Sequence, residues 1–425
     1  MFIAGTIFAM PFGSLPRATT TTASARCYGF VSLHRNRRWE KRTRNIRCYS
    51  TASHVENGVL PASRIGLDPR SNKRHCPLVY HEDYSFADWP PEHTFPMNKF
   101  ERLANAILTS PITDLNDDPL VLDPSHFFRP LDYTSTNLAT IQKWLCGPLN
   151  ATFVDRFLQG RLTAEEVRLI GFREQTYRPE LIRRTVLELA GTLLTAHLAC
   201  QYGVAANLAG GTHHAHHEMG AGYTILNDLV VTAHQMTTTT TTTNSPGSTT
   251  SISLGNNSAS VLQRVLVIDC DVHQGDGTAR CMQEIPSLSG KLFTLSLHCE
   301  SNYPHPKARS TFDVGLPDKM KDEAYLKVLH ESVDHAITKV QPDLVLYDAG
   351  VDVYRHDKLG RLHVSEEGIR KRDRYVLEAC VSRNIPVAAV IGGGYDSDED
   401  ALARRHAILH EECSKVWRER KMWKK

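Results

Sequence analysis

Three aspartates and a histidine stand close together near the middle of the chain: Asp269, Asp271, His273 and Asp276. They follow the apolar run 265–268, whose β-branched residues predict a buried strand of a parallel sheet. Carboxylates are costly to bury without a positive partner, so we expect one among them. Oxygen and nitrogen ligands without paired thiolates suit a divalent metal of the zinc type. The alternative is a capping turn whose acids are solvated.

Other residues of catalytic type also follow glycines or apolar runs. They are His213 and His214 after a glycine pair, Asp352 after the apolar run 344–347, and Tyr395 after three glycines. A glycine pair lets the backbone approach a ligand closely. In parallel sheets, ligands bind beyond the carboxyl ends of the strands, so we expect these clusters to converge there. That convergence favours a metal site over the capping turn.

The elements that must position these residues alternate along the chain from about residue 77. Strands are predicted over 77–81, 265–268, 292–298, 344–347 and 386–391. Helices are predicted over 227–236, 322–340 and 398–417, and the segment 136–202 is mostly helical, most clearly from Pro179 to near Gly203. Two further helices are predicted to begin after an N-cap residue, one after Asn98 and one from Ser365 to 383. This alternation predicts a single α/β domain with a central, mostly parallel sheet flanked by helices.

Composition sets limits on the class of protein. The chain has 425 residues, of which 41% are hydrophobic and 23% charged, as in ordinary globular proteins. A net charge of +2 argues against direct nucleic-acid binding. Ten cysteines without a CxxC pair predict reduced thiols, and no run of about 18 apolar residues predicts a membrane span. The oligomeric state is left open.

Residues 1–54 carry nine Lys/Arg residues and a single acid, Glu40. Such a basic, Ser/Thr-rich segment predicts an organelle transit peptide, with the mitochondrion as first expectation and the chloroplast as alternative. A disordered basic tail, with nuclear or cytoplasmic residence, is the other interpretation. Residues 55–75 are predicted to be a linker and 76–418 the catalytic domain. The Thr/Ser-rich stretch 237–260 is predicted to be a disordered surface insertion.

Four motifs in this order resemble the zinc-dependent histone deacetylase superfamily. They are Gly-Gly-Thr-His-His-Ala (210–215), Asp-Cys-Asp-Val-His-Gln-Gly-Asp-Gly (269–277), Asp-Ala-Gly-Val-Asp (348–352) and Gly-Gly-Gly-Tyr (392–395). The resemblance covers roughly 77–415 and implies an arginase/deacetylase-like fold and zinc-dependent hydrolysis of the amide of N6-acyl-lysine. Gln274, where class I enzymes carry a second His, and the segment 357–373 look like the class IV branch.

The resemblance also implies roles for individual residues. Asp271, His273 and Asp352 would bind one Zn²⁺, with Fe²⁺ as a possible substitute. The catalytic residues would be His213 held by Asp269, His214 held by Asp276 as proton shuttle, and Tyr395 as electrophile; Gly222 and Tyr223 would wall the acyl-lysine tunnel. A structural K⁺ would be held by Asp269, Ser296, Leu297 and backbone oxygens of Asp271 and His273. His216 and His217 are interpreted as loop surface, and Cys270 as core.

Three other functions are weighed against this one. A ureohydrolase with two manganese ions would want further carboxylates where Gly275, Gly350 and Tyr354 stand, so one metal is the better prediction. A small-molecule amide such as an acetylpolyamine is an alternative substrate to an acyl-lysine protein of an organelle. A non-catalytic scaffold is disfavoured, because the complete set of candidate catalytic residues is present.

Overall fold

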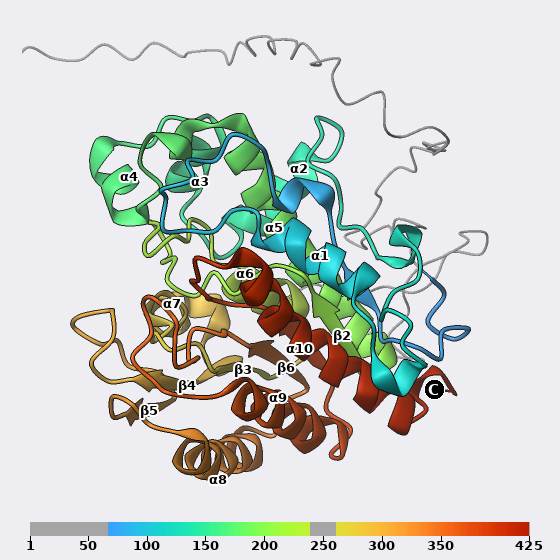
Figure 1. Cartoon of the computed structure of the whole chain (residues 1–425). Coiled ribbons are helices and arrows are strands. Elements are labelled where there is room, and N and C mark those ends of the chain that lie inside the picture. The colour runs from blue at the N-terminus through green and yellow to red at the C-terminus, as the bar shows by residue number, and fades with distance from the viewer. Residues whose placement is uncertain (1–66, 239–260, 425) are drawn as a thin grey trace, which may run out of the picture. The chain divides into compact units, whose positions relative to one another are not determined.

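A parallel sheet forms the centre of the fold in the computed structural model, which describes residues 67–238 and 261–424 (Figure 1). Within these residues seven strands pair in the order β1-β2-β7-β6-β3-β4-β5, and every pair is parallel. The strands are β1 (Leu78–Val79), β2 (Val204–Asn207), β3 (Val265–Asp269), β4 (Leu292–Cys299), β5 (Phe312–Leu316), β6 (Leu344–Asp348) and β7 (Val387–Val390). The predicted α/β fold with a central parallel sheet is therefore confirmed.

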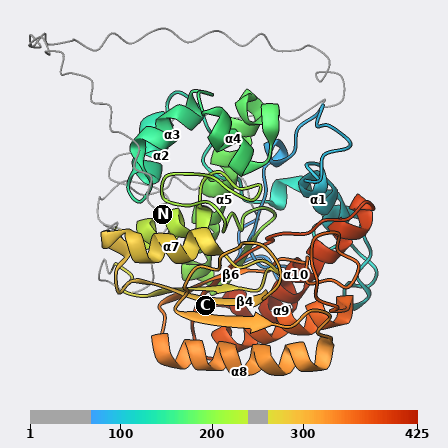
Figure 2. The same ribbon diagram turned by 90° about the vertical axis from the view of Figure 1, so that its left-hand side faces the viewer.

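Helices cover both faces of this sheet. The α-helices of the described residues are α1 (Lys99–Thr109), α2 (Leu138–Cys146), α3 (Ala151–Leu158), α4 (Ala164–Ile170), α5 (Pro179–Tyr202), α6 (Asp228–Thr238), α7 (Asp276–Glu284), α8 (Asp322–Val340), α9 (Glu366–Val381) and α10 (Glu399–Glu419). Helices α5, α6 and α7 lie on one face, and α8, α9 and α10 on the other, as Figure 2 shows with α8 on the far side of the strands from α7. Helix α1 packs against α10.

Burial from both sides explains why the central strands are continuous apolar runs. Every residue of β3, β6 and β7 is buried. Helix α5 is also buried over most of its circumference, because it packs on β2 and β7 and against α6. It begins at Pro179, whose fixed φ suits the first helical position, and it ends before Gly203, which has a φ of 94°.

Three elements were not predicted. Strand β2 contains only four residues, two of them alanine, and lies directly after α5. Strand β5 is the last strand of the order and is half exposed, so it lacks the apolar run of the central strands. Helix α7 begins at Asp276, inside the metal-type motif, and its nine residues are mostly polar.

Two N-caps and two boundaries can be compared with the predictions. Ser365 caps α9 by accepting from the Gly368 N–H at 3.0 Å, as predicted, but the side chain of Asn98 makes no capping hydrogen bond to α1. The predicted linker extends too far, because Asn72 is buried and its carbonyl accepts from Trp417 at 2.8 Å. The predicted insertion begins two residues too early, because α6 continues through residue 238.

The predictions for 1–54, for 55–66 and for 239–260 lie outside the described residues. No helix in the described ranges is both long and apolar enough to cross a bilayer.

Candidate active site

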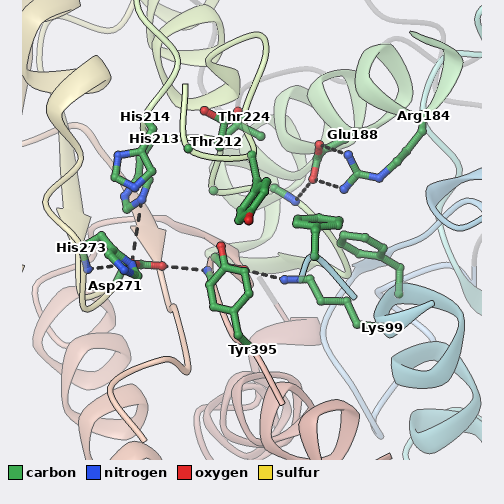
Figure 3. A pocket seen from close by; sticks show the side chains of 18 residues that line it. Lys99, Arg184, Glu188, Thr212, His213, His214, Thr224, Asp271, His273 and Tyr395 are labelled. Carbon is green, nitrogen blue, oxygen red and sulfur yellow. Dashed lines mark hydrogen bonds and ion pairs between the residues drawn. The ribbon is translucent and has the colours of Figure 1, made fainter. Parts of the chain in front are cut away.

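Four strands deliver their carboxyl ends to one edge of the sheet. The loops after β2, β3, β6 and β7 carry, in that order, the His pair, the Asp/His motif, Asp352 and Tyr395. In the sheet, Asp269 at the end of β3 lies beside Asp348 of β6, which in turn lies beside Val390 of β7. The predicted convergence of these clusters is therefore what the structure has. His213, His214, Asp271, His273 and Tyr395 line one pocket (Figure 3), and Asp352 lies behind it, 3.1 Å from Nδ1 of His273.

Asp271, His273 and Asp352 form a compact group of potential metal ligands. The Nδ1 atom of His273 lies 3.0 Å from an oxygen of Asp271 and 3.1 Å from an oxygen of Asp352. One ligand atom from each residue lies within 4.8 Å of the others, and all three residues are buried. Burial and the neighbouring charge of Asp271 raise the pKa of Asp352 to about 7. A divalent cation among these ligands would relieve that repulsion, so the donor set fits zinc.

A buried guanidinium holds the two loops that supply these ligands. Arg372 of α9 is 0% exposed and donates to the carbonyls of Gly350 at 2.6 Å, Ala349 at 3.1 Å and Cys270 at 3.3 Å. Its Nε also donates to Asp373 at 2.9 Å. The sequence analysis did not give Arg372 this role; its only local signal is a cation on the buried side of a helix.

Each histidine of the pair has a carboxylate partner. The Nδ1 of His213 lies 2.8 Å from Asp269, and the Nδ1 of His214 lies 2.7 Å from Asp276. Burial and the neighbouring His213 lower the pKa of His214 to about 4, so His214 is neutral at pH 7. Burial alone would lower the pKa of His213, but the charges of Asp269 and Asp271 hold it well above its usual value. The two rings are thus suited to different tasks, one as a base and one as a positive charge.

The two further histidines of this loop are not free surface side chains. The Nε2 of His216 lies 3.3 Å from the second oxygen of Asp276, and its side chain is only 12% exposed. The Nδ1 of His217 lies 2.8 Å from the Pro148 carbonyl. Both are half-buried loop residues outside the potential metal-ligand groups of the described residues, and each has a polar partner in the fold.

Tyr395 is positioned by its backbone. Its N–H donates to Asp357 at 2.7 Å, and its carbonyl accepts from Lys358 at 3.0 Å. Burial holds the pKa of Tyr395 well above its usual value, so its hydroxyl remains a hydrogen-bond donor. Two residues earlier, the N–H of Gly393 donates to Asp271 at 2.8 Å, and a Cβ at Gly393 would lie within 2.5 Å of carboxylate oxygens of Asp271 and Asp352. A residue with a side chain would therefore displace these ligands.

Aromatic rings lie on two sides of the potential metal-ligand group. Tyr223 has a φ of 63° and packs with His93, Phe95 and Phe172. On the other side, the ring of Tyr303 lies 4.9 Å from that of His214 and is 43% exposed. The wall at Tyr223 was expected, but Tyr303 was missed because no motif surrounds it.

Asp269 and Ser296, from the predicted potassium site, lie directly beside each other in the register of β3 and β4. The Ser296 hydroxyl is 3.0 Å from Nδ1 of His298, and Leu297 is fully buried. These residues are therefore neighbours, as a shared ion requires. Gln274 has a structural role, since its amide contacts the backbone of Ala308 and donates to Asp313 at 2.7 Å.

The pocket also has an inner end that the sequence analysis missed completely. It is lined by Lys99 of α1 and by Arg184 and Glu188 of α5. These residues lie on the far side of Tyr395 from the histidines (Figure 3).

Comparison with known proteins agrees with this geometry. The family model described as the histone deacetylase domain matches residues 151–245 and 249–410. An uncharacterized protein of Picosynechococcus sp. is 38% identical over 341 residues, which cover 80% of this chain and 99% of that protein. Histone deacetylase 2 of Arabidopsis thaliana is 25% identical over 369 residues, which cover 83% of this chain and 84% of that protein.

Among solved structures, the fold resembles the crystal structure of the HDA15 HD domain. The TM-score is 0.55 at 16% sequence identity, and the match covers 83% of this chain and 93% of that one. At this identity the match bears on the fold alone. Because the family model spans more than half of the chain and both sequence relatives align over most of its length, this chain belongs to the histone deacetylase family.

Proposed function

We propose that this protein is a zinc-dependent amidohydrolase that removes acyl groups from the N6 atom of lysine side chains in proteins. The observation that carries the proposal is one pocket lined by His213, His214, Asp271, His273 and Tyr395. Three further aspartates bond to its histidines: Asp269 to His213, Asp276 to His214 and Asp352 to His273. Membership of the histone deacetylase family supports deacetylation as the reaction class.

Three protein ligands leave a coordination position open for substrate. A bound Zn²⁺ would polarise the scissile carbonyl and lower the pKa of the water that attacks it; Fe²⁺ is the alternative ion. His214, neutral and oriented by Asp276, takes the proton of that water and returns it to the leaving lysine amine. The Tyr395 hydroxyl donates to the oxyanion, while the positive charge of His213 stabilises it from the other side.

The geometry favours one metal over the two of a ureohydrolase. A Cβ at Gly275 would lie 2.4 Å from an oxygen of Asp269, and a Cβ at Gly350 would lie 2.4 Å from an oxygen of Asp271. Neither position has room for a further carboxylate ligand. His213, Asp269 and Asp348 form a second acidic group, but the Nδ1 of His213 is engaged with Asp269 at 2.8 Å and is not free to bind an ion.

The flanking rings of Tyr223 and Tyr303 suit the apolar stem of a lysine side chain, and an acetylpolyamine with a similar stem is the alternative substrate. We place a structural K⁺ at Asp269 and Ser296. The class IV-like assignment rests on Gln274 and the segment 357–373, and the mitochondrial assignment on residues 1–54. The proposed partner is therefore an acyl-lysine protein of that organelle, without direct nucleic-acid contact.

The experiment is hydrolysis of acetyl-lysine peptides by the purified full-length chain, with and without a chelator. We expect chelator-sensitive activity that falls about 10²–10³-fold in Tyr395→Phe, because one oxyanion donor is lost. Tyr354→Phe, a tyrosine that packs on Arg405 outside the pocket, is the matched control. Activity on acetylpolyamines but on no peptide would replace the lysine substrate, and activity unchanged in Tyr395→Phe would contradict the mechanism.

The location is tested separately by fusing residues 1–54 to a fluorescent reporter. Mitochondrial fluorescence is expected, and a diffuse cytosolic signal would refute the targeting proposal.

A further inference from the structure

The inner end of the pocket contains a buried cation that the proposed reaction does not use. Lys99 is 2% exposed, and it lines the same pocket as Asp271, His273 and Tyr395. Figure 3 shows its ammonium group on the opposite side of Tyr395 from the histidines. This end of the pocket is where the acyl group of a substrate held at Asp271 and His273 would extend.

The neighbouring charges do not neutralise Lys99. Glu188 is bonded to both terminal nitrogens of Arg184, each at 3.0 Å, and one of its oxygens also accepts from the Gly210 N–H at 3.1 Å. Lys99 donates to the carbonyl of Gly392 at 3.1 Å and has no carboxylate within 4.0 Å among the described residues. One ion pair and one unpaired ammonium leave this end of the pocket with a single positive charge.

The surroundings of the ammonium make this charge costly. Its Nζ lies 5.4 Å from the ring centre of Phe95 and 5.3 Å from that of Phe100. Aromatic faces stabilise a cation only partly, and one backbone carbonyl uses one of its three N–H groups. An anion that entered the cavity would stabilise a buried ammonium with so few partners.

A single peptide group sets the distance between this cation and the ligand group. The peptide that joins Gly392 to Gly393 accepts from Lys99 through its carbonyl and donates to Asp271 through its N–H, at 3.1 Å and 2.8 Å. The ammonium nitrogen therefore lies no more than about 8 Å from that carboxylate oxygen. An acyl chain with two or three methylenes beyond the scissile carbonyl spans such a separation.

We propose that Lys99 forms a carboxylate-binding subsite, and that the preferred acyl groups are dicarboxylic ones such as succinyl and glutaryl. This inference rests on the proposed acyl-lysine hydrolysis and specifies its substrate class. A carboxylate could also come from the acid released by the reaction, so the test must separate substrate selectivity from binding of the product.

The test uses the full-length enzyme and one peptide sequence that carries acetyl-, succinyl- or glutaryl-lysine. Two control peptides carry the succinyl or glutaryl group with its terminal carboxylate replaced by a neutral amide of nearly the same shape. We expect kcat/KM at least tenfold higher for each carboxylated group than for its neutral amide. In Lys99→Met, of similar length but uncharged, this ratio should fall to about one, and Lys99→Arg should restore part of it. Lys371→Met, at an exposed lysine in the first half of α9 that does not line the pocket, is the matched control and should keep the wild-type ratio.

If Lys99→Met fails to fold, the wild-type ratio of kcat/KM between each carboxylated group and its neutral amide decides the inference. Hydrolysis of acetyl-lysine with carboxylated groups no better than their amides would overturn the inference and leave the proposed function intact. Weaker inhibition of Lys99→Met by free acetate without any acyl preference would assign the subsite to the product, which also overturns the inference. No hydrolysis of any peptide would overturn the proposed function itself.

Discussion

The two ends of the pocket are built from different kinds of element. The end with Asp271, His273 and Asp352 comes from loops at the carboxyl ends of neighbouring strands. The inner end comes from Lys99 of α1 and from Arg184 and Glu188 of α5, whose positions are set by helix packing. Reacting groups thus lie on a rigid sheet edge, while the space for the acyl group is bounded by helices.

The charges at the two ends are balanced differently as well. Each histidine of the first end has a carboxylate within 3.0 Å, and Arg372 fixes the loops that carry the ligands. At the inner end one ion pair is complete and one cation lacks a counterion. The comparison teaches that the proposed reaction needs only a metal to complete the first end, whereas the proposed subsite at the inner end needs an anionic ligand to complete its charges.

The largest expected effect is at the first end. Asp352→Asn removes a proposed metal ligand and should lower kcat/KM by at least about 10³-fold, since a catalytic metal contributes several kcal/mol. Its metal content, measured by mass spectrometry, should fall below that of the wild type, whereas Lys99→Met should keep its metal. Full metal content with full activity in Asp352→Asn would contradict the assignment of metal binding to the first end.

The inner ion pair should matter for stability. Arg184→Met leaves Glu188 buried without its partner and should lower the free energy of unfolding by about 3–5 kcal/mol, measured with denaturant. The double variant Arg184→Met/Glu188→Leu should cost less than the two single changes together, because neither charge remains. Lys371→Met, which breaks a pair more than 60% exposed on each side, should change stability by less than about 1 kcal/mol. Equal losses in the buried and exposed pairs would contradict this assignment.

A titration of stability against pH should detect the buried ammonium of Lys99 at the inner end. Burial and the charge of Arg184 lower the pKa of Lys99 from 10.5 to about 8. Between these values the unfolded chain binds the proton and the folded chain does not, so Lys99 makes stability rise as pH increases from 8 to 10.5, by up to about 3 kcal/mol. Unfolding midpoints of wild type and Lys99→Met at pH 7.5 and pH 10 measure this contribution. An identical rise in both proteins would show that Lys99 is not the titrating group.

The smallest effect should come from His216, which lies outside the pocket lining and contacts Asp276 beside the first end. His216→Gln removes a partly exposed contact with Asp276 while His214 keeps its own, so kcat/KM should fall by less than about tenfold. Steady-state kinetics on an acetyl-lysine peptide provide the measurement. A loss approaching that of Asp352→Asn would make His216 part of the catalytic machinery.

Much of the first end could be predicted from the sequence because its information is local. A run such as 265–268 followed at once by Asp269 and Asp271 specifies a strand and the groups at its end. The same logic placed β6 and β7 with Asp352 and Tyr395. The helices that begin at Pro179 and after Ser365 were equally clear, because their start signals are single residues.

The inner end could not be predicted, because a charge in a helix normally indicates a solvated face. Lys99, Arg184 and Arg372 are each at most 3% exposed, yet nothing adjacent in sequence distinguishes them from surface cations. Their burial depends on which helices pack against the sheet, and this is decided over the whole fold. Asn98 shows the same limit at small scale, since its type suits an N-cap but its helical ψ of −4° leaves the side chain without a capping bond.

The connection between α6 and β3 has a practical consequence for engineering. The N–H of Leu262 donates to the carbonyl of Met236 at 3.3 Å, so the described residues on the two sides of 239–260 lie close together. Closing or lengthening such a connection has a small entropic cost. Residues 239–260 can therefore be replaced by a short glycine-serine link or by an affinity tag, and the melting temperature of the product should stay within a few degrees of the parent.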